Sequence, residues 1–248
     1  MLLNLYNIIL IPWLILAIIS FFLLFKITAP YGKFSNRKFG FLIDYKLGWF
    51  IQEIISPLFL LYFFIIGSGE KSIIHWFLIL IWITHYINRS IIFPLRINKS
   101  SKIPISVICS AIFFNIVNGF INGFHLGNLA VFSNDYIFSL NFIIGLPLFI
   151  IGTLININAD NVLIKIKKQN NGYQIPKGKL YNLISCPNYL GEMMEWIGFA
   201  FMCWSLPSLL FAIWTIANLF PRALSQHKWY KEKFDYPSNR KAIIPYII

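Results

Sequence analysis

Long apolar runs separated by short polar loops occupy most of this chain. A helix needs about 20 predominantly apolar residues to cross a bilayer, and five runs reach that length, at about residues 5–25, 47–66, 73–93, 104–124 and 136–156. A further apolar region, about residues 189–220, is too long for one helix. Pro207 favours a break near its middle, because proline disfavours a helical conformation in the residue before it. Two short helices are therefore predicted there, which makes seven transmembrane helices in all.

The composition agrees with an all-α, polytopic membrane protein. Hydrophobic residues make up 58% of the chain and charged residues only 12%, a balance that soluble domains do not show. The first apolar run is too long for the core of a signal peptide and no basic residue precedes it, so we expect it to be retained. Residues 1–135 are expected to form a first domain of four helices, and residues 136–248 a second domain with three helices, polar loops and a tail.

Lysine and arginine gather in alternate loops and in the tail. These residues are Lys26, Lys33, Arg37, Lys38 and Lys46; Arg96, Lys99 and Lys102; Lys165, Lys167, Lys168, Lys177 and Lys179; and Arg222, Lys228, Lys231, Lys233, Arg240 and Lys241. The loops around residues 67–72 and 125–135 hold one lysine and no arginine. Since short cytoplasmic loops carry the excess of basic residues, we predict an outer N-terminus and a cytoplasmic C-terminus. Topology and attraction to anionic lipid then account for the net charge of +12 without a nucleic-acid partner.

The cysteines and histidines carry no recognisable site. Cys109, Cys186 and Cys203 are few and unpatterned, so we expect neither a disulfide framework nor a metal site. The four histidines lack the spacing of a helical zinc motif, and the chain has no Walker loop and no Gly-x-Gly-x-x-Gly.

Polar side chains within the second and third apolar runs are candidates for a binding cavity. Glu53 follows Trp49 and Gln52 in an otherwise apolar helix, where an acid costs about 2.5–3.5 kcal/mol and usually faces a cavity. The alternative is an acid near the interface that pairs with a cation. In the third run, Tyr86 could face the same cavity or belong to an aromatic belt, and Arg89 could reach the interface as a long cationic side chain.

A second polar group lies towards the C-terminus. Asn156 and Asp160 share one helix face, and residues 172–179 form a Gly- and Pro-rich turn that contains Tyr173. After Pro187, Asn188 and Glu192 begin a polar stripe that Glu195 continues. This stripe could form a pocket or a structural hydrogen-bond seam between helices. The tail, residues 221–234, reads as a basic amphipathic helix that lies on the membrane or binds phosphate.

These motifs resemble the steroid 5-alpha-reductase family, the 3-oxo-5-alpha-steroid 4-dehydrogenases. The resemblance rests on ordered matches at residues 156–160, 173–178, 185–192, 195–196, 204–207, 221–223, 227–230, 236–237 and 240–245. In the first half, residues 49–53 match Trp-x-x-Gln-Glu, and residues 85–89 match His-Tyr-x-x-Arg. The family consists of membrane enzymes that use NADPH to reduce the C4–C5 double bond of 3-oxo-4-ene steroids.

The resemblance implies roles for individual residues. Glu53 and Tyr86 would be catalytic and hydrogen-bond the substrate ketone, and Trp49 and Gln52 would join them in binding the substrate, a steroid or sterol-like apolar enone. Hydride addition to the β-carbon builds charge on the ketone oxygen, which such donors stabilise. The residues expected to bind NADPH are Asn156, Asp160, Lys167, Tyr173, Asn188, Glu192, Arg222, His227 and Tyr230.

Some positions depart from the animal members of the family. Asn158, Ala159, Lys179 and Gln226 stand where those enzymes tend to have other residues, and we expect these positions to border the cofactor. The protein is expected to be a monomer in the inner membrane of a bacterium or the endoplasmic reticulum of a eukaryote. Two alternatives remain at this point. One is a membrane methyltransferase that uses S-adenosylmethionine, and the other is a non-catalytic lipid-binding or transport protein.

Overall fold

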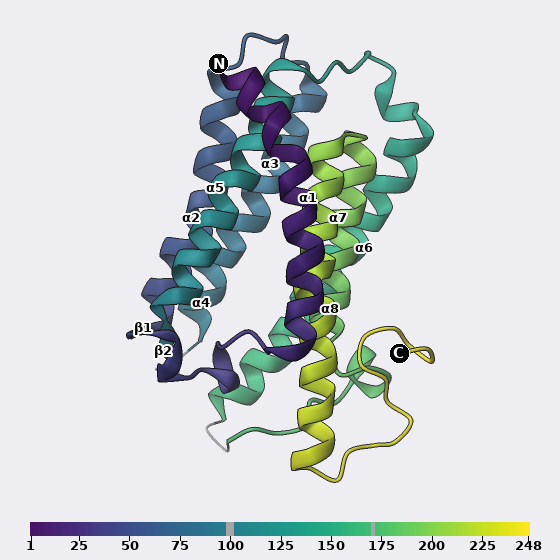
Figure 1. Cartoon of the computed structure of the whole chain (residues 1–248). Helices are drawn as coiled ribbons and strands as arrows, with labels where there is room; N and C mark the ends of the chain where they lie inside the picture. Colours follow the sequence, from purple (N-terminus) through teal and green to yellow (C-terminus); the bar gives the residue numbers. More distant parts are fainter. Residues whose placement is uncertain (98–101, 170–171) are drawn as a thin grey trace. The chain divides into compact units, whose positions relative to one another are not determined.

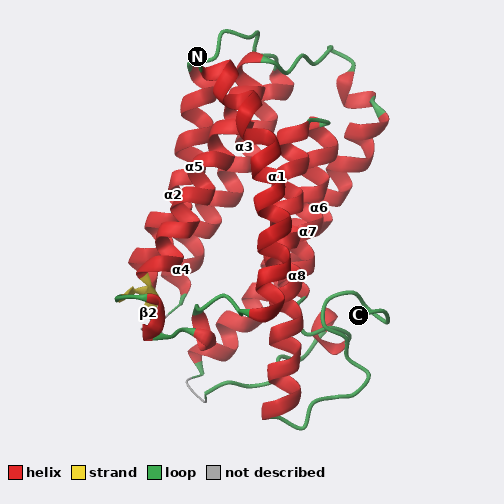
Figure 2. Cartoon of the chain, viewed as in Figure 1, coloured by secondary structure: helices red, strands yellow, loops and turns green. Residues whose placement is uncertain are grey.

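Helices account for most of the computed structural model, which describes residues 1–97, 102–169 and 172–248 (Figure 2). The helices are α1 Leu2–Lys26, α2 Tyr45–Ile65, α3 Ile73–Ile87, α4 Phe93–Arg96, α5 Ile105–Asn128, α6 Leu140–Lys168, α7 Pro187–Cys203 and α8 Leu206–Lys233. A π-helical turn, η3 Asn88–Ile92, joins α3 to α4, and two short strands, β1 Leu42–Asp44 and β2 Lys102–Pro104, pair antiparallel. Lys99, one of the predicted loop cations, lies outside the described residues.

Within the described residues, six helical stretches are long and apolar enough to cross a membrane. They are α1, α2, Ile73–Arg96, α5, α6 and α8. This confirms a multi-pass, helical membrane protein. The predicted sixth span corresponds to α7, which has 17 residues and is not among these six stretches.

The predicted break in the last apolar region is confirmed, whereas the lengths of two helices differ from the prediction. Trp204 ends α7 with a left-handed conformation, φ 44°, and Ser205 caps α8. The second helix is not short, because α8 continues through Pro221 to Lys233. Proline is tolerated in membrane helices, where neighbouring groups satisfy the freed carbonyl. Likewise α6 does not end near Asn156 but continues for three more turns to Lys168.

The chain forms two compact units, and the first comprises Met1–Ile11 and Ala29–Phe142. In this unit α2 and α5 lie side by side (Figure 1). A Cβ atom added at Gly119 would lie 3.0 Å from the main-chain oxygen of Ser56, so a glycine permits the close approach of these helices. Strands β1 and β2 pair Ile43 with Ile103 and so tie the beginnings of α2 and α5 together.

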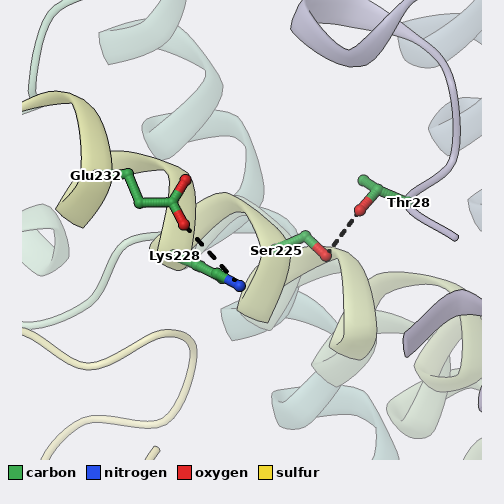
Figure 3. Close-up of polar contacts among 4 residues, drawn as sticks. All are labelled: Thr28, Ser225, Lys228 and Glu232. Atoms are coloured by element: carbon green, nitrogen blue, oxygen red, sulfur yellow. Dashed lines mark hydrogen bonds and ion pairs between the residues drawn. The ribbon is translucent and has the colours of Figure 1, made fainter. Parts of the chain in front are cut away.

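The second unit comprises Pro12–Thr28 and Ile143–Ile248. The part of α1 in this unit and the residues directly after it are held against α8 by two hydrogen bonds. The indole of Trp214 donates to the main-chain oxygen of Trp13 over 3.1 Å, and the Thr28 hydroxyl donates to the Ser225 hydroxyl over 3.1 Å (Figure 3). The exposed ion pair further along α8, Lys228 with Glu232 at 3.9 Å, adds little stability because water screens it.

The C-terminal segment of the second unit covers the start of α7. The main-chain NH of Ser185 donates to the Lys241 carbonyl over 2.9 Å, and Lys241 donates back to Leu183 over 2.9 Å. Ala223 and Ile243 pack in one apolar cluster with Met193 of α7. The residues around Asn188 therefore lie in a well-anchored part of the fold.

Candidate active site

A buried polar layer crosses the first unit at the level of Tyr86. The Tyr86 hydroxyl donates to the side-chain oxygen of Asn115 over 3.5 Å, and the Asn115 amide donates to the main-chain oxygen of Gln52 over 2.6 Å. The Gln52 amide in turn donates to the Glu53 carboxyl over 3.1 Å. Three helices, α2, α3 and α5, thus bring polar groups together inside an apolar bundle. Tyr86 is only 4% exposed, so its phenol is aimed at protein or substrate rather than at water.

Trp49 forms one wall of this layer. Its ring stacks on Tyr45 with centroids 5.2 Å apart, and the Arg89 guanidinium lies 5.5 Å from its centre. Among the described residues, the indole nitrogen of Trp49 and the side-chain oxygen of Gln52 are buried atoms without a hydrogen-bond partner. Buried polar atoms are normally paired. A buried donor and a buried acceptor that lack partners in the protein suit a polar group of a bound molecule.

The backbone departs from regular helix directly after Tyr86. The Ser90 hydroxyl donates to the Tyr86 main-chain oxygen over 2.6 Å, within the π-turn Asn88–Ile92. Such turns are frequent at functional sites because they re-aim neighbouring side chains. The Arg89 guanidinium lies over two aromatic rings, 5.5 Å from the centre of Trp49 and 5.1 Å from that of Phe93, and its reach to the interface stays a prediction.

Asn115 is a site residue that the sequence interpretation missed. It lies within the fourth apolar run, on one stripe of α5 with Asn118 and Asn122, and all three are buried. The signal was available, because asparagines within a transmembrane helix usually face other helices or a cavity.

A second polar cluster lies between α6 and α7. The Asn156 amide donates to the Asn188 main-chain oxygen over 2.9 Å and to the Glu192 carboxyl over 3.4 Å. The Asn188 amide donates to Asp160 over 3.3 Å. A Cβ atom at Gly191 would lie 2.5 Å from the Asn156 main-chain nitrogen, so the glycine lets the two helices come this close. The structure therefore unites four residues that lie up to 36 positions apart in the sequence.

Basic and aromatic side chains flank this cluster along α8. Arg222 is buried and its Nε donates to the Tyr189 hydroxyl over 3.0 Å. Tyr230 stacks on Tyr236 with centroids 5.4 Å apart. The Ser185 hydroxyl lies 2.6 Å from the His227 ring nitrogen and 2.7 Å from the Tyr236 hydroxyl. Ser185 and Tyr236, which the sequence matched but did not assign, thus hold His227 in place.

Two predicted cofactor residues lie at the periphery. Lys167 is exposed near the end of α6. Tyr173 is also exposed and packs edge to face against Trp229, with ring centroids 5.2 Å apart. Burial of part of its ring raises the pKa of Tyr173, so the phenol stays neutral and offers a hydrogen-bond donor at physiological pH.

With this geometry established, comparison with known proteins shows the family. The sequence model of 3-oxo-5-alpha-steroid 4-dehydrogenase matches residues 101–248, which is more than half of the chain. The chain belongs to the 3-oxo-5-alpha-steroid 4-dehydrogenase family. The resemblance drawn from the motifs is therefore confirmed, and the family is one of steroid oxidoreductases.

Individual relatives cover nearly the whole chain. The steroid 5-alpha-reductase of Solanum lycopersicum is 40% identical over 250 residues, which span 98% of this chain and 97% of the relative. The 3-oxo-5-alpha-steroid 4-dehydrogenase 1 of Rattus norvegicus is 34% identical over 237 residues, 94% of this chain and 92% of the relative. The human protein of that name is 33% identical over 224 residues, 89% and 86% of the two chains. The methyltransferase alternative receives no support from these relatives.

The positions that depart from the animal members of this family occupy different surroundings. Lys179 donates to the side-chain oxygen of Asn158 over 2.7 Å, and both line a groove on a face of α6 other than that of Asn156. Ala159 is buried, and its main-chain oxygen accepts from the Tyr181 hydroxyl over 3.4 Å. Burial, and then the nearby Asp160 carboxylate, raise the pKa of Tyr181 well above its ordinary value. Tyr181 also lines the groove and lies near Asp160.

Proposed function

We propose that this protein is an NADPH-dependent reductase of the C4–C5 double bond of 3-oxo-4-ene steroids or a similar flat, apolar enone. The observation that carries the proposal is the buried layer of Tyr86, Asn115, Gln52 and Glu53 within apolar helices. Such a layer has a buried phenolic donor beside a half-buried carboxyl group, which suits recognition of a single ketone on an apolar ligand. The family and its relatives support the same reaction class.

Tyr86 is the proposed electrophile. Addition to the β-carbon of an enone places negative charge on the distant ketone oxygen, and a preorganised donor at that oxygen stabilises the resulting enolate. Asn115 holds the Tyr86 hydroxyl, and Glu53 acts as its partner, either as a second donor in protonated form or by orienting the phenol. Trp49 and Gln52 complete the substrate contacts with the polar atoms that the protein leaves unpaired.

The second unit has the hydrogen-bonding and cationic side chains that a dinucleotide requires. Amides and carboxylates of Asn156, Asp160, Asn188 and Glu192 suit the carboxamide and hydroxyl groups of NADPH. Cationic groups suit its phosphates, and a guanidinium gives bidentate contacts. The residues in this role are Arg222 and Lys167, with His227 as a ring N–H donor and Tyr173 and Tyr230 as neighbouring aromatic donors. Bound NADPH supplies the hydride, and these residues bind and orient it.

The membrane arrangement belongs to the same proposal. We infer seven spans, with α7 as the short sixth, an outer N-terminus and a cytoplasmic C-terminus. The basic loops and the ends of α6 and α8 then face the compartment that holds NADPH. The protein would act as a monomer in the inner membrane of a bacterium or the endoplasmic reticulum of a eukaryote.

Thermal unfolding of the purified protein with different cofactors tests the proposal. A ligand that binds only the folded state stabilises it by about 2.7 kcal/mol at a hundred times its Kd. NADPH should raise the unfolding temperature, and S-adenosylmethionine should not. The proposal would be overturned by a response to S-adenosylmethionine alone, or by NADPH binding that persists after Asn156, Asp160 and Arg222 are all replaced by alanine.

A further inference from the structure

A groove of about 190 Å³ lies in the second unit, between α6 and the turn that precedes α7. Its walls are mostly apolar, and Ile151, Leu154, Ile155 and Val162 line one side. Asn158 and Lys179, which share a 2.7 Å hydrogen bond, supply polar groups to it. The groove is smaller than the roughly 300–1,000 Å³ usual for a drug-sized ligand. It fits a chain or a fragment better than a whole steroid.

The groove and the proposed cofactor residues use opposite faces of α6. Successive residues of a helix turn by about 100°, so Asn158 and Val162 each lie within roughly 20° of Ile151. On the same count Asn156 and Asp160 lie about 140° to 180° round the helix from Ile151. The groove and the Asn156 cluster therefore lie on different faces of α6, although the groove also reaches Pro187, directly before Asn188.

The same rotation of about 100° per residue places the lysines at the end of α6 on different faces of the helix. Lys165 falls about 40° from Ile151, on the face of the groove, whereas Lys167 falls about 160° away, on the face of Asp160. Both are exposed. Lys179 lines the groove, Lys165 follows Val162, the last α6 residue that lines it, by about one helical turn, and no carboxylate is among the described residues that line it.

The backbone at Lys179 is the second unusual feature. This residue has φ 50°, the left-handed region that favours glycine, and Gly178 before it has φ 90°. The turn is closed by a hydrogen bond from the Gly178 NH to the Asn182 side chain, 2.8 Å long. Non-glycine residues in this conformation are rare and cluster at ligand sites. A lysine held there directs an ammonium group to Asn158 at the groove.

From these observations we propose that the groove binds one anionic membrane phospholipid, with part of an acyl chain along Ile151, Leu154 and Ile155 and its phosphate at Lys179 and Lys165. The position suits such an occupant, because the groove runs along the apolar part of a candidate membrane span and stops about one turn before the lysines at its end. Anionic headgroups are attracted to basic residues at that level. An ammonium group carries three donors, and the bond to Asn158 uses one of them.

The test measures thermal unfolding of the full chain in neutral detergent while short-chain lipids are added. The ligands are dioctanoyl phosphatidylglycerol, dioctanoyl phosphatidylcholine and inorganic phosphate. Phosphatidylglycerol should raise the unfolding temperature, and the other two should do so only at much higher concentrations. In the Lys165→Gln/Lys179→Gln variant the concentration for half-maximal effect should rise by about tenfold or more, as expected from the loss of charge-assisted bonds.

Two further variants keep the result interpretable. Lys167→Gln removes a lysine from the opposite face of α6 and should keep the wild-type response to phosphatidylglycerol. Lys179→Gly replaces the strained residue by one that tolerates φ 50°, so it should fold well and still lose most of the response. The inference is overturned if phosphatidylcholine or inorganic phosphate acts at the same concentration as phosphatidylglycerol. It is also overturned if the double variant responds like the wild type, or if Lys167→Gln loses the response.

A parallel titration with NADPH separates this inference from the proposed function. Stabilisation by NADPH should persist in the Lys165→Gln/Lys179→Gln variant, since its lysines lie away from Asp160. A wild-type chain that responds to phosphatidylglycerol but not to NADPH would support the lipid site and overturn the proposed cofactor. Loss of both responses in the double variant would show that one shared anion site serves both ligands and would overturn the separate lipid site.

Discussion

The side-chain amide of Asn156 donates to the main-chain carbonyl of Asn188 over 2.9 Å. Through this bond α6 holds the first turn of α7, and the same amide also reaches Glu192. Replacing Asn156 by alanine should raise the KM for NADPH by about tenfold, because one or two hydrogen bonds worth roughly 1 kcal/mol each are lost with the site's geometry. Steady-state kinetics with varied NADPH measure this.

Asn161 provides the matched control for that change. It carries the same side chain on the same helix but is exposed and lies about 140° round the helix from Asn156. Asn161→Ala should leave the KM for NADPH at the wild-type value. An equal effect of both variants would mean that loss of any amide from α6 disturbs the protein, and the specific role of Asn156 would be wrong.

The glycine at the α6–α7 crossing should be necessary for cofactor binding. Gly191→Ala places a methyl group against the Asn156 main chain, so it should cost about 1–3 kcal/mol of stability by overpacking and raise the KM for NADPH. Gly198→Ala makes a similar clash with Phe149, two turns along the same interface. It should lower the unfolding temperature to a similar extent without changing the KM. Thermal unfolding and kinetics on both variants distinguish packing from binding.

Asn115 should act as a positioning residue for Tyr86. Asn115→Leu removes the acceptor that lies 3.5 Å from the Tyr86 hydroxyl, so kcat should fall by about tenfold, the size expected for a misplaced donor. The KM for NADPH should not change. Asn115→Gln, which keeps an amide, should recover part of the lost kcat. A purely structural role would instead lower the unfolding temperature of both variants and leave kcat per folded molecule unchanged.

Tyr181 should make the protein sensitive to alkaline pH. Burial and the Asp160 carboxylate raise its pKa well above the ordinary value of 10.0. A neutral group with a raised pKa in the folded state contributes stability that is fully present below the unfolded pKa and is lost as pH rises through the folded pKa. The unfolding temperature should therefore fall more steeply above about pH 10 in the wild type than in Tyr181→Phe.

A constant difference between the two proteins is also expected, since Tyr181→Phe loses the hydrogen bond to Ala159 at every pH. Tyr173→Phe serves as the comparison, because that ring is more than half exposed. If the pH dependence of Tyr181→Phe were identical to that of the wild type between pH 8 and 12, ionisation of Tyr181 would not contribute to alkaline unfolding.

Much of the fold could be predicted from hydropathy, but helix ends depended on tertiary context. Pro207 indicated the break between α7 and α8 correctly, and it lies in the first turn of α8, where a proline lacks no helical hydrogen bond. Pro221 gave the opposite result, since α8 passes through it. Whether a proline ends a helix therefore depends on the groups around it and not on the residue type alone. The extension of α6 to Lys168 was missed because lysines end a membrane span without ending a helix.

The part of the site that lies within sequence motifs could be predicted. The part that depends on packing between helices was harder to predict. Asn156, Asp160, Asn188 and Glu192 do form one hydrogen-bonded cluster. Asn158 lies on another face of α6 than Asn156 and bonds Lys179, and its place at the border of the cofactor stays a prediction. The pairing of Asn115 with Tyr86 needed the register of α3 against α5, which the sequence of either helix does not contain.

Reduction of a 3-oxo-4-ene steroid by the purified protein, with NADPH consumption and product formation followed together, tests the central claim most directly. The wild type should form one saturated 3-ketone for each NADPH consumed. Tyr86→Phe should lower kcat by about 10²–10³, as loss of one oxyanion donor does, while the KM for NADPH stays near the wild-type value. The account would be contradicted if the wild type consumed no NADPH with such a steroid, or if Tyr86→Phe and Glu53→Gln both turned over at the wild-type rate.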